Sequence, residues 1–268
     1  MGRLLPLGRA FFAIALVGLG SHHLLLRGFV TGRAPAWPAS VPGEVAWAYA
    51  TGLLFMAAGI AILAGRHARV AVIVAATPML FWGVLRHIPV VAGSAWFSGV
   101  WTQAGKAVWL VAGSLMVAAT FPPWTSDRSP ALRKLLNLNR EFVVAGRIAL
   151  AVFLVLTGVQ HFLFTPFVAS LIPAWFPGDA VHWTWFAGVA LIAGGAGLLI
   201  PRTARLAASL SGLMIFSWFL IVHVSREFAG VADDISVFEA LAATGLLFVL
   251  AAIERKESGD REVRAPHS

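Results

Sequence analysis

Two stretches of this chain, GRAFFAIALVGLGSHHL at residues 8–24 and GRIALAVFLVLTGVQHF at residues 146–162, decide the fold. Each opens on Gly-Arg, continues through an apolar run and reaches a histidine near its end, His23 in the first and His161 in the second. About 20 mainly apolar residues allow a helix to cross a bilayer. The two stretches therefore predict one transmembrane helix that occurs twice in the chain.

The composition extends this prediction to the whole chain. Hydrophobic residues make up 59% of the 268 residues and charged residues only 12%, and the mean hydropathy is +0.82. A soluble domain of this size cannot bury so much apolar surface. We therefore predict an all-α membrane protein with eight transmembrane helices. They cover approximately residues 9–26, 45–64, 68–88, 100–120, 142–164, 182–200, 203–224 and 236–253.

The basic residues predict the orientation of these helices. They gather in alternate segments between the apolar runs, as with Arg3 and Arg9 before the first run and Arg66 and Arg69 after the second. The positive-inside rule then places both termini in the cytoplasm. It also explains the formal net charge of +8, so the predicted partner is the lipid bilayer and not a nucleic acid. Cysteine is absent, so any redox chemistry would need another electron carrier.

Rare residue types reveal an internal repeat. At an offset of 138 residues, Pro35-Ala36-Trp37 meets Pro173-Ala174-Trp175, Trp47 meets Trp185 and Ala58-Gly59 meets Ala196-Gly197. After a two-residue slip, Trp82 meets Trp218 and His87 meets His223. A unit of four spans enters the membrane twice in the same direction, which predicts two parallel, pseudo-symmetric four-helix bundles. The predicted boundaries are 1–120 for the first repeat, 121–141 for a cytoplasmic linker, 142–253 for the second repeat and 254–268 for a cytoplasmic tail.

Ionisable side chains within spans are costly, and they usually face a protein interior or a watery cavity. Four histidines lie at one predicted depth near the outer face, and four tryptophans lie around them. Imidazoles can ligate haem iron or exchange protons with a quinol, and indoles offer flat apolar walls. A structural alternative stays open, in which the histidines bond loops and the tryptophans form an interfacial belt. The candidate cofactor-binding residues are His23, His87, His161, His223, Trp82, Trp218, Trp37 and Trp175.

Lys106 and Glu239 form a second candidate pair. They fall within one position of each other when the repeats are aligned through Gly113 and Gly245. An interior ion pair is therefore predicted, acting either as structural glue or as a proton relay. The sequence lacks a phosphate-binding glycine loop, a serine nucleophile elbow and zinc-type histidine spacing, so we assign no catalytic residue and no metal ligand.

The second repeat resembles the DoxX-like family of small four-helix membrane proteins. The resemblance rests on Gly158-Val159-Gln160-His161-Phe162, Ile172-Pro173-Ala174-Trp175-Phe176-Pro177 and Gly194-Gly195-Ala196-Gly197-Leu198-Leu199-Ile200-Pro201-Arg202. The first repeat is a more diverged copy, with Gly20-Ser21-His22-His23. This resemblance implies a bacterial or archaeal cytoplasmic membrane and permits a quinone-linked role. The family often has a glutamate in its second span, whereas this chain reads Ala190-Leu191 there.

Two functional hypotheses follow. The first is a redox subunit that handles quinone or haem near the outer face, together with another membrane or redox subunit. The second is a non-enzymatic protein, either an assembly factor for a membrane complex or a carrier of a small apolar solute. Whether the chain is an enzyme is left open by its sequence.

Overall fold

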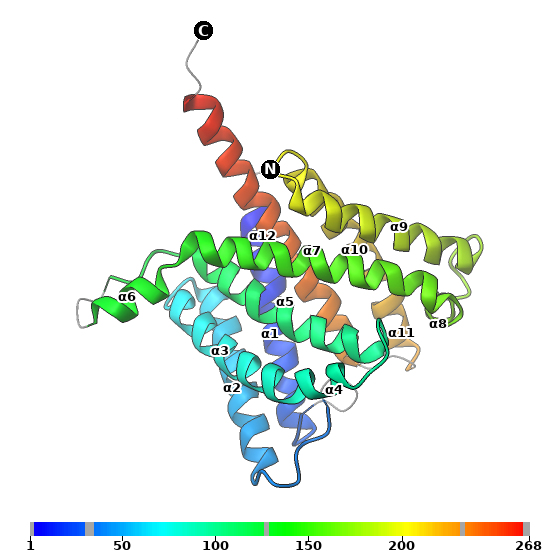
Figure 1. The fold of residues 1–268 in the computed structure, drawn as a ribbon, viewed down its shortest axis with the longest axis horizontal. Helices are drawn as coiled ribbons and strands as arrows, with labels where there is room; N and C mark the ends of the chain where they lie inside the picture. The colour runs from blue at the N-terminus through cyan, green and yellow to red at the C-terminus, as the bar shows by residue number, and fades with distance from the viewer. Residues whose placement is uncertain (1–2, 30–34, 126–128, 231–233, 265–268) are drawn as a thin grey trace.

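The structure is a computed structural model and describes residues 3–29, 35–125, 129–230 and 234–264. The described residues form helices and no strand (Figure 1). Their bounds are α1 Leu4–Leu25, α2 Glu44–Ala64, α3 Ala68–Trp82, η1 Gly83–His87, α4 Ile88–Ala92, α5 Gly99–Ala119, α6 Pro130–Leu136, α7 Asn139–Leu163, α8 Thr165–Ser170, α9 Ala180–Leu199, α10 Ala204–Trp218, η2 Phe219–Val224, α11 Ser225–Phe228 and α12 Asp234–Arg264.

Seven helical segments of the described chain are long and apolar enough to cross a membrane. They comprise α1, α2, α3 through α4, the segment containing α7, α9, α10 through α11, and Ile235–Glu254 of α12. The fourth predicted span corresponds to α5, which has 21 residues but is not among the seven. Thr102, Gln103 and Lys106 make the first half of α5 more polar than the other spans.

The long helices follow one another in a closed packing order. Helix α1 packs on α2, α2 on α3, α3 on α5, α5 on α7, α7 on α9, α9 on α10, α10 on α12, and α12 on α1. The fourth helix of each predicted repeat therefore packs on the first helix of the other repeat. Two four-helix bundles were expected, whereas in the structure the two predicted repeats exchange their fourth helices, α5 and α12. Helix α12 is the most enclosed, since 78% of its Ile235–Glu254 segment is buried.

Glycines allow α1 and α12 to touch along their backbones. A Cβ atom at Gly245 would lie 2.7 Å from the Gly8 carbonyl oxygen and 2.7 Å from the Phe12 nitrogen. Further along α1, toward its C-terminal end, a Cβ atom at Gly18 would collide with the ring of Phe238 in α12. Small residues permit such close approach of membrane helices, where dispersion contacts replace the hydrophobic effect as the driving force. These contacts show that the two helices run antiparallel, so the start of α1 lies beside Gly245 and Val249 of α12.

We expect Gly245→Val to destabilise the protein by about 1–3 kcal/mol, because the added methyl groups must push α1 away from α12. Gly99→Val is the matched control, since a Cβ atom at Gly99 has no neighbour within 4 Å. Thermal unfolding of the two variants in detergent measures the difference. Equal unfolding midpoints for the two variants would show that the α1–α12 seam tolerates extra volume.

Close contacts correct the alignment of the repeats within their second helices. A Cβ atom at Gly52 would meet the Gly20 oxygen and the His23 Cβ, and one at Gly188 would meet the Gly158 oxygen and the His161 Cβ. Gly52 thus matches Gly188 at an offset of 136, and Trp47 matches Trp183 and not Trp185. The two-residue slip lies in the connections that precede these helices, between Leu25 and Glu44 in the first repeat and between Leu163 and Ala180 in the second. A loop absorbs an insertion, whereas a helix would rotate its buried face away from its neighbours.

Helix α3 is tied to the linker by the buried guanidinium of Arg69. Its side chain donates hydrogen bonds to five acceptors, and the residue is only 4% exposed. The acceptors are the carbonyl oxygens of Phe121 (2.7 Å), Pro122 (2.8 Å) and Leu136 (2.8 Å) and the side-chain oxygens of Asn137 (3.3 Å) and Asn139 (2.8 Å). The sequence identified Arg69 only as a topology signal, yet it organises the polypeptide between α5 and α7.

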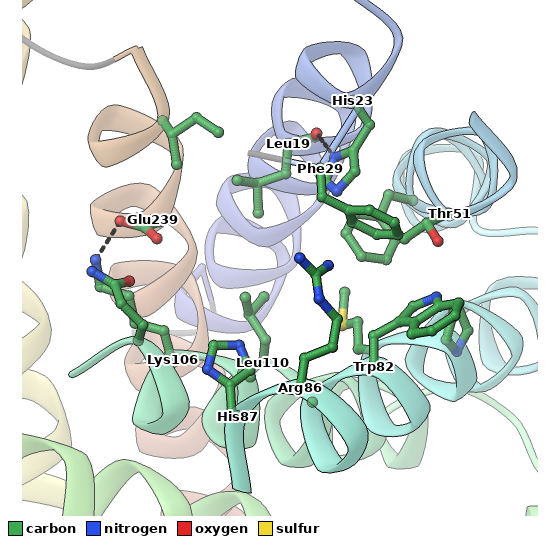
Figure 2. Close-up of a pocket in the computed structure, with 17 residues that line it drawn as sticks. Leu19, His23, Phe29, Thr51, Trp82, Arg86, His87, Lys106, Leu110 and Glu239 are labelled. Atoms are coloured by element: carbon green, nitrogen blue, oxygen red, sulfur yellow. Dashed lines mark hydrogen bonds and ion pairs between the residues drawn. The ribbon is translucent and has the colours of Figure 1, made fainter. Parts of the chain in front are cut away.

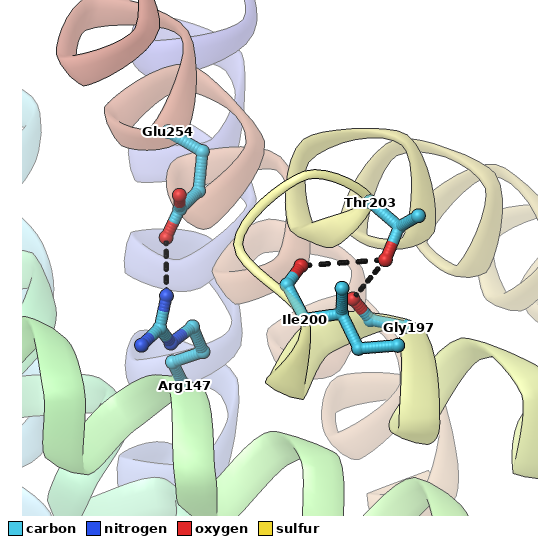
Figure 3. A network of polar contacts seen from close by, with 5 residues as sticks. All are labelled: Arg147, Gly197, Ile200, Thr203 and Glu254. Carbon is cyan, nitrogen blue, oxygen red and sulfur yellow. Dashed lines mark hydrogen bonds and ion pairs between the residues drawn. The ribbon is translucent and has the colours of Figure 1, made fainter.

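Two predicted boundaries change. The linker predicted at 121–141 contains the short helix α6, and α7 begins inside it at Asn139. The tail predicted at 254–268 continues α12 as far as Arg264, while residues 265–268 lie outside the described chain. At the start of this extension, Arg147 of α7 forms an ion pair of 3.3 Å with buried Glu254 of α12 (Figure 3). Figure 3 also shows Thr203, whose hydroxyl donates to the Gly197 oxygen and closes the α9–α10 turn.

A π-helical segment interrupts the third helix of each repeat at the same place. Segment η1 follows α3 and ends at His87, and segment η2 follows α10 and includes His223. Each begins directly after a tryptophan, Trp82 in the first case and Trp218 in the second. Short π-helical turns are rare and frequently occur at functional sites. They direct attention to the ends of these helices.

Candidate functional site

The four predicted histidines divide between two pockets. His23 and His87 line a first pocket of about 140 Å³, and His161 and His223 line a second pocket of about 500 Å³. We expected one set of four histidines between the two repeats. The packing order explains the difference. Helix α5 lies between α3 and α7, and α12 lies between α10 and α1, so these two helices separate the two pairs of histidines. Helix α5 contributes to both pockets, with Lys106 in the first and Thr102 in the second.

Aromatic rings form one wall of the first pocket. Trp82 lies at its centre, with ring centroids 4.7 Å from Trp37, 5.5 Å from Trp47 and 5.9 Å from Phe29. Phe29 and Trp37 stack at 5.3 Å with an interplanar angle of 10°. Of the two predicted tryptophans, Trp82 lines the pocket and Trp37 does not. Phe29 contacts both indoles and also His23, because its ring lies 5.5 Å from the imidazole.

The imidazoles of His23 and His161 have the same local geometry. His23 Nδ1 lies 2.7 Å from the Leu19 oxygen, and His161 Nδ1 lies 2.7 Å from the Thr157 oxygen, one helical turn earlier in each case. A carbonyl oxygen can only accept, so Nδ1 must carry the proton. In the neutral ring Nε2 is then a hydrogen-bond acceptor. Each of these histidines thus offers its pocket a nitrogen lone pair.

Charged side chains distinguish the first pocket (Figure 2). Lys106 of α5 and Glu239 of α12 form the predicted interior ion pair, with Nζ 2.6 Å from Oε2. Arg86 projects from η1 between His87 and Trp82 toward Phe29, as Figure 2 shows, and is 6% exposed. Its Nη2 donates to the carbonyl oxygen of Pro35. The first pocket is therefore small, aromatic on one side and charged on the other.

The second pocket is larger and more apolar. Trp218 and Trp183 lie in its wall with ring centroids 6.1 Å apart. Phe176 packs on both rings, at 5.6 Å from Trp218 and 5.2 Å from Trp183. The predicted wall residue Trp175 is 64% exposed, and its ring contacts Phe176 at 5.9 Å. Neither Trp175 nor Phe176 lines the pocket, but Phe176 supports the two tryptophans that do.

Polar groups in the second pocket come from α5, α7, α9 and η2. Buried Gln160 accepts a hydrogen bond of 2.7 Å from the Thr102 hydroxyl and donates to the Phe97 oxygen at 2.9 Å. This network holds the start of α5 against the end of α7. Helix α9 is set by Asp179, whose carboxylate caps the amides of Val181 (2.7 Å) and His182 (3.1 Å). The hydrogen bond from the His182 amide, and to a smaller extent that from the Val181 amide, lowers the pKa of Asp179. The same cap fixes the first turn of α9, which carries Trp183.

Sequence reasoning missed several residues of these pockets. Arg86 was not among the candidate residues, although it lies next to His87 within the predicted span 68–88, and that position was the available signal. Gln103 lines the first pocket, and Gln160 and Trp183 line the second. In the described part of the chain, no group of three or more His, Cys, Asp or Glu side chains is placed to hold a metal ion.

Comparisons with known proteins add one match. No curated protein and no solved structure matches the chain. A family model described as a domain of unknown function, DUF8561, matches residues 150–250. The matched residues run from the first half of α7 into α12 and include every helix that lines the second pocket apart from α5.

Proposed function

We propose that this chain is a multi-pass protein of a bacterial or archaeal cytoplasmic membrane that binds a quinone or quinol in its second pocket. The observation that carries the proposal is the pocket itself. Its volume of about 500 Å³ lies in the range of about 300–1,000 Å³ that is typical of small-molecule sites. It combines apolar and aromatic walls with the acceptor nitrogen of His161. A flat, apolar ring with oxygen substituents matches that combination.

The proposed membrane arrangement has eight spans with both termini in the cytoplasm, as two parallel copies of a four-helix unit. Helix α5 counts as a span because it packs between α3 and α7, where its lysine pairs with Glu239. Paired ionisable groups that face the interior are the kind that a bilayer tolerates. The recurrence of π-helical segments after α3 and α10 and of the His23 and His161 geometry supports the duplication.

The chemistry proposed for the second pocket is proton exchange with a bound ring. A quinol hydroxyl can donate to His161 Nε2, while Trp183 and Trp218 provide apolar walls beside the ring. Electrons must pass to another carrier, because the chain has no cysteine and thus no dithiol or thiolate-bound cluster of its own. A second membrane or redox subunit would fill that role. The resemblance to the DoxX-like family, some of whose members are subunits of quinone-linked oxidoreductases, agrees with this proposal.

Quinol binding to purified protein in nanodiscs tests the proposal. We expect saturable binding of decylubiquinol, measured by calorimetry without oxygen, with an affinity about three- to tenfold weaker in His161→Leu because the hydrogen bond from the quinol hydroxyl to Nε2 is lost. His87→Leu is the matched control in the first pocket and should leave the affinity unchanged. Equal weakening by both variants, or no saturable binding, would contradict the assignment.

The same preparation separates the alternatives. Haem would appear in a reduced-minus-oxidised absorption spectrum, since two histidines line the pocket and paired imidazoles can ligate haem iron. A carrier of small apolar solutes is favoured by the mostly apolar lining of the second pocket. For a carrier, decylubiquinol and a hydrocarbon of similar size should bind equally well, and His161→Leu should have no effect on either.

A further inference from the structure

Two polar side chains in the first pocket have atoms that lack partners. The Nε atom of Arg86 and the Oε1 atom of Gln103 are both buried and form no hydrogen bond with the described residues. Both residues line the pocket. Buried polar atoms are nearly always hydrogen-bonded, and an unsatisfied charged donor is the most costly exception. The pocket therefore contains one donor and one acceptor without partners, and unsatisfied polar groups are especially costly within a bilayer.

The charge of Arg86 is only partly satisfied within the protein. Its guanidinium carbon lies 4.9 Å from the ring centroid of Phe29 and 5.4 Å from that of Trp37, and Nη2 donates to the Pro35 oxygen. Among the described residues no carboxylate forms an ion pair with it. Glu44 acts on Arg86 electrostatically from the first turn of α2, but it does not line the pocket. A guanidinium in such a site lacks the bidentate acceptor that suits it best.

This charge is specific to the first pocket. At the offset of 136 that matches Trp82 with Trp218 and His87 with His223, Arg86 corresponds to Val222. Both residues are buried, with exposures of 6% and 7%, and both line their pockets. The lining of the second pocket includes no Arg, Lys, Asp or Glu. Packing alone can therefore be achieved with valine at this position, and the arginine calls for a different explanation.

The neighbouring charges favour an anionic ligand. Lys106 is neutralised by Glu239 at 2.6 Å, which leaves the guanidinium as the excess charge of the pocket lining. The Gln103 amide can turn by 180° about its last bond and present N–H donors instead of oxygen. The volume of about 140 Å³ admits a molecule of only a few heavy atoms. We propose that the first pocket binds a small carboxylate, with Arg86 as its principal ligand and Gln103 as a second donor.

Acetate binding to the full-length protein tests this assignment. The protein is held in nanodiscs at constant ionic strength, and acetate is exchanged for chloride while the thermal unfolding midpoint is recorded. We expect a saturable rise of the midpoint with acetate and none with acetamide, which has nearly the same shape without the charge. Stabilisation by a ligand that binds only the folded state grows with its concentration relative to Kd.

Variants then locate the site. Arg86→Gln should weaken acetate binding at least tenfold, Gln103→Leu should weaken it severalfold, and Arg86→Lys should retain part of the affinity. Val222→Ala, at the corresponding position of the second pocket, should bind acetate as the parent does. If Arg86→Gln folds poorly, Gln103→Leu alone decides the question.

Three results would overturn the proposal. They are an unchanged acetate response in both Arg86→Gln and Gln103→Leu, an equal response to acetamide, and the absence of any saturable response in the parent protein. The last would mean that the pocket holds only solvent. None of them bears on quinone binding in the second pocket, so the two proposals fail separately.

Discussion

Arg69→Ala should lower the free energy of unfolding by about 3 kcal/mol or more, because it removes a buried charge-assisted network. The guanidinium satisfies three carbonyl oxygens and two asparagine side chains of the polypeptide between α5 and α7. Alanine would leave the buried carbonyl oxygens without donors and a void at the start of α3. Unfolding by SDS titration from detergent micelles, followed by circular dichroism, measures the loss.

Arg66→Ala is the control for this prediction. Arg66 carries the same charge three residues earlier, at the same end of the helix assembly, but it is exposed. Both changes remove one basic residue from the same side of the membrane, so an effect on insertion would be shared. Arg69→Lys should fall between the two, since an ammonium cannot reach five acceptors at once. If Arg69→Ala unfolded at the same midpoint as Arg66→Ala, the network would be dispensable.

Lys106→Met should destabilise the protein by about 3–5 kcal/mol, because it leaves the carboxylate of Glu239 buried without its cation. The side chains of the pair are only 18% and 11% exposed, so water cannot easily replace the lost partner. Glu239→Leu should cost a similar amount. The double variant with both changes should recover most of the loss, since replacing both charges by apolar groups removes the desolvation penalty.

This double-variant comparison also separates the two roles that the sequence left open. A purely structural pair predicts that the double variant regains stability and still exchanges protons with a bound quinol, while a proton relay predicts a stable protein that has lost this exchange. Thermal unfolding, and proton release on binding of decylubiquinol followed with a pH-sensitive dye on the same samples, provide the two measurements. Strictly additive destabilisation in the double variant would show that the two side chains do not act as a pair.

The residues that the sequence located correctly are those fixed by the repeat. His23 and His161 adopt the same bond to the preceding turn because both stand near the end of a first helix at equal spacing. The pair Lys106 and Glu239 emerged from aligning Gly113 with Gly245, and both side chains face the interior between α5 and α12. A duplicated pattern constrains both the position of a residue along its helix and the helix face on which the residue lies. A single motif does not constrain both.

The residues that the sequence misplaced depend on local geometry that spacing does not encode. Arg86 lies in a π-helical turn, where a wider turn shifts the faces of the following residues away from the regular 3.6-residue pattern. Trp175 and Phe176 are adjacent aromatic residues, and only the loop conformation decides which one reaches Trp218. The division of the histidines into two pockets follows from helix order, which no residue spacing determines.

Because α5 and α12, the fourth helices, each pack on the other repeat, it matters that both repeats lie in one polypeptide. A single four-helix unit would expose the faces that now pack α12 on α1 and α5 on α7, so two copies would have to associate to cover them. Two identical chains could form such an assembly only with identical pockets on both sides. Joining the units in one polypeptide frees each pocket to change by itself, and the contrast between Arg86 and Val222 is an example of that independence.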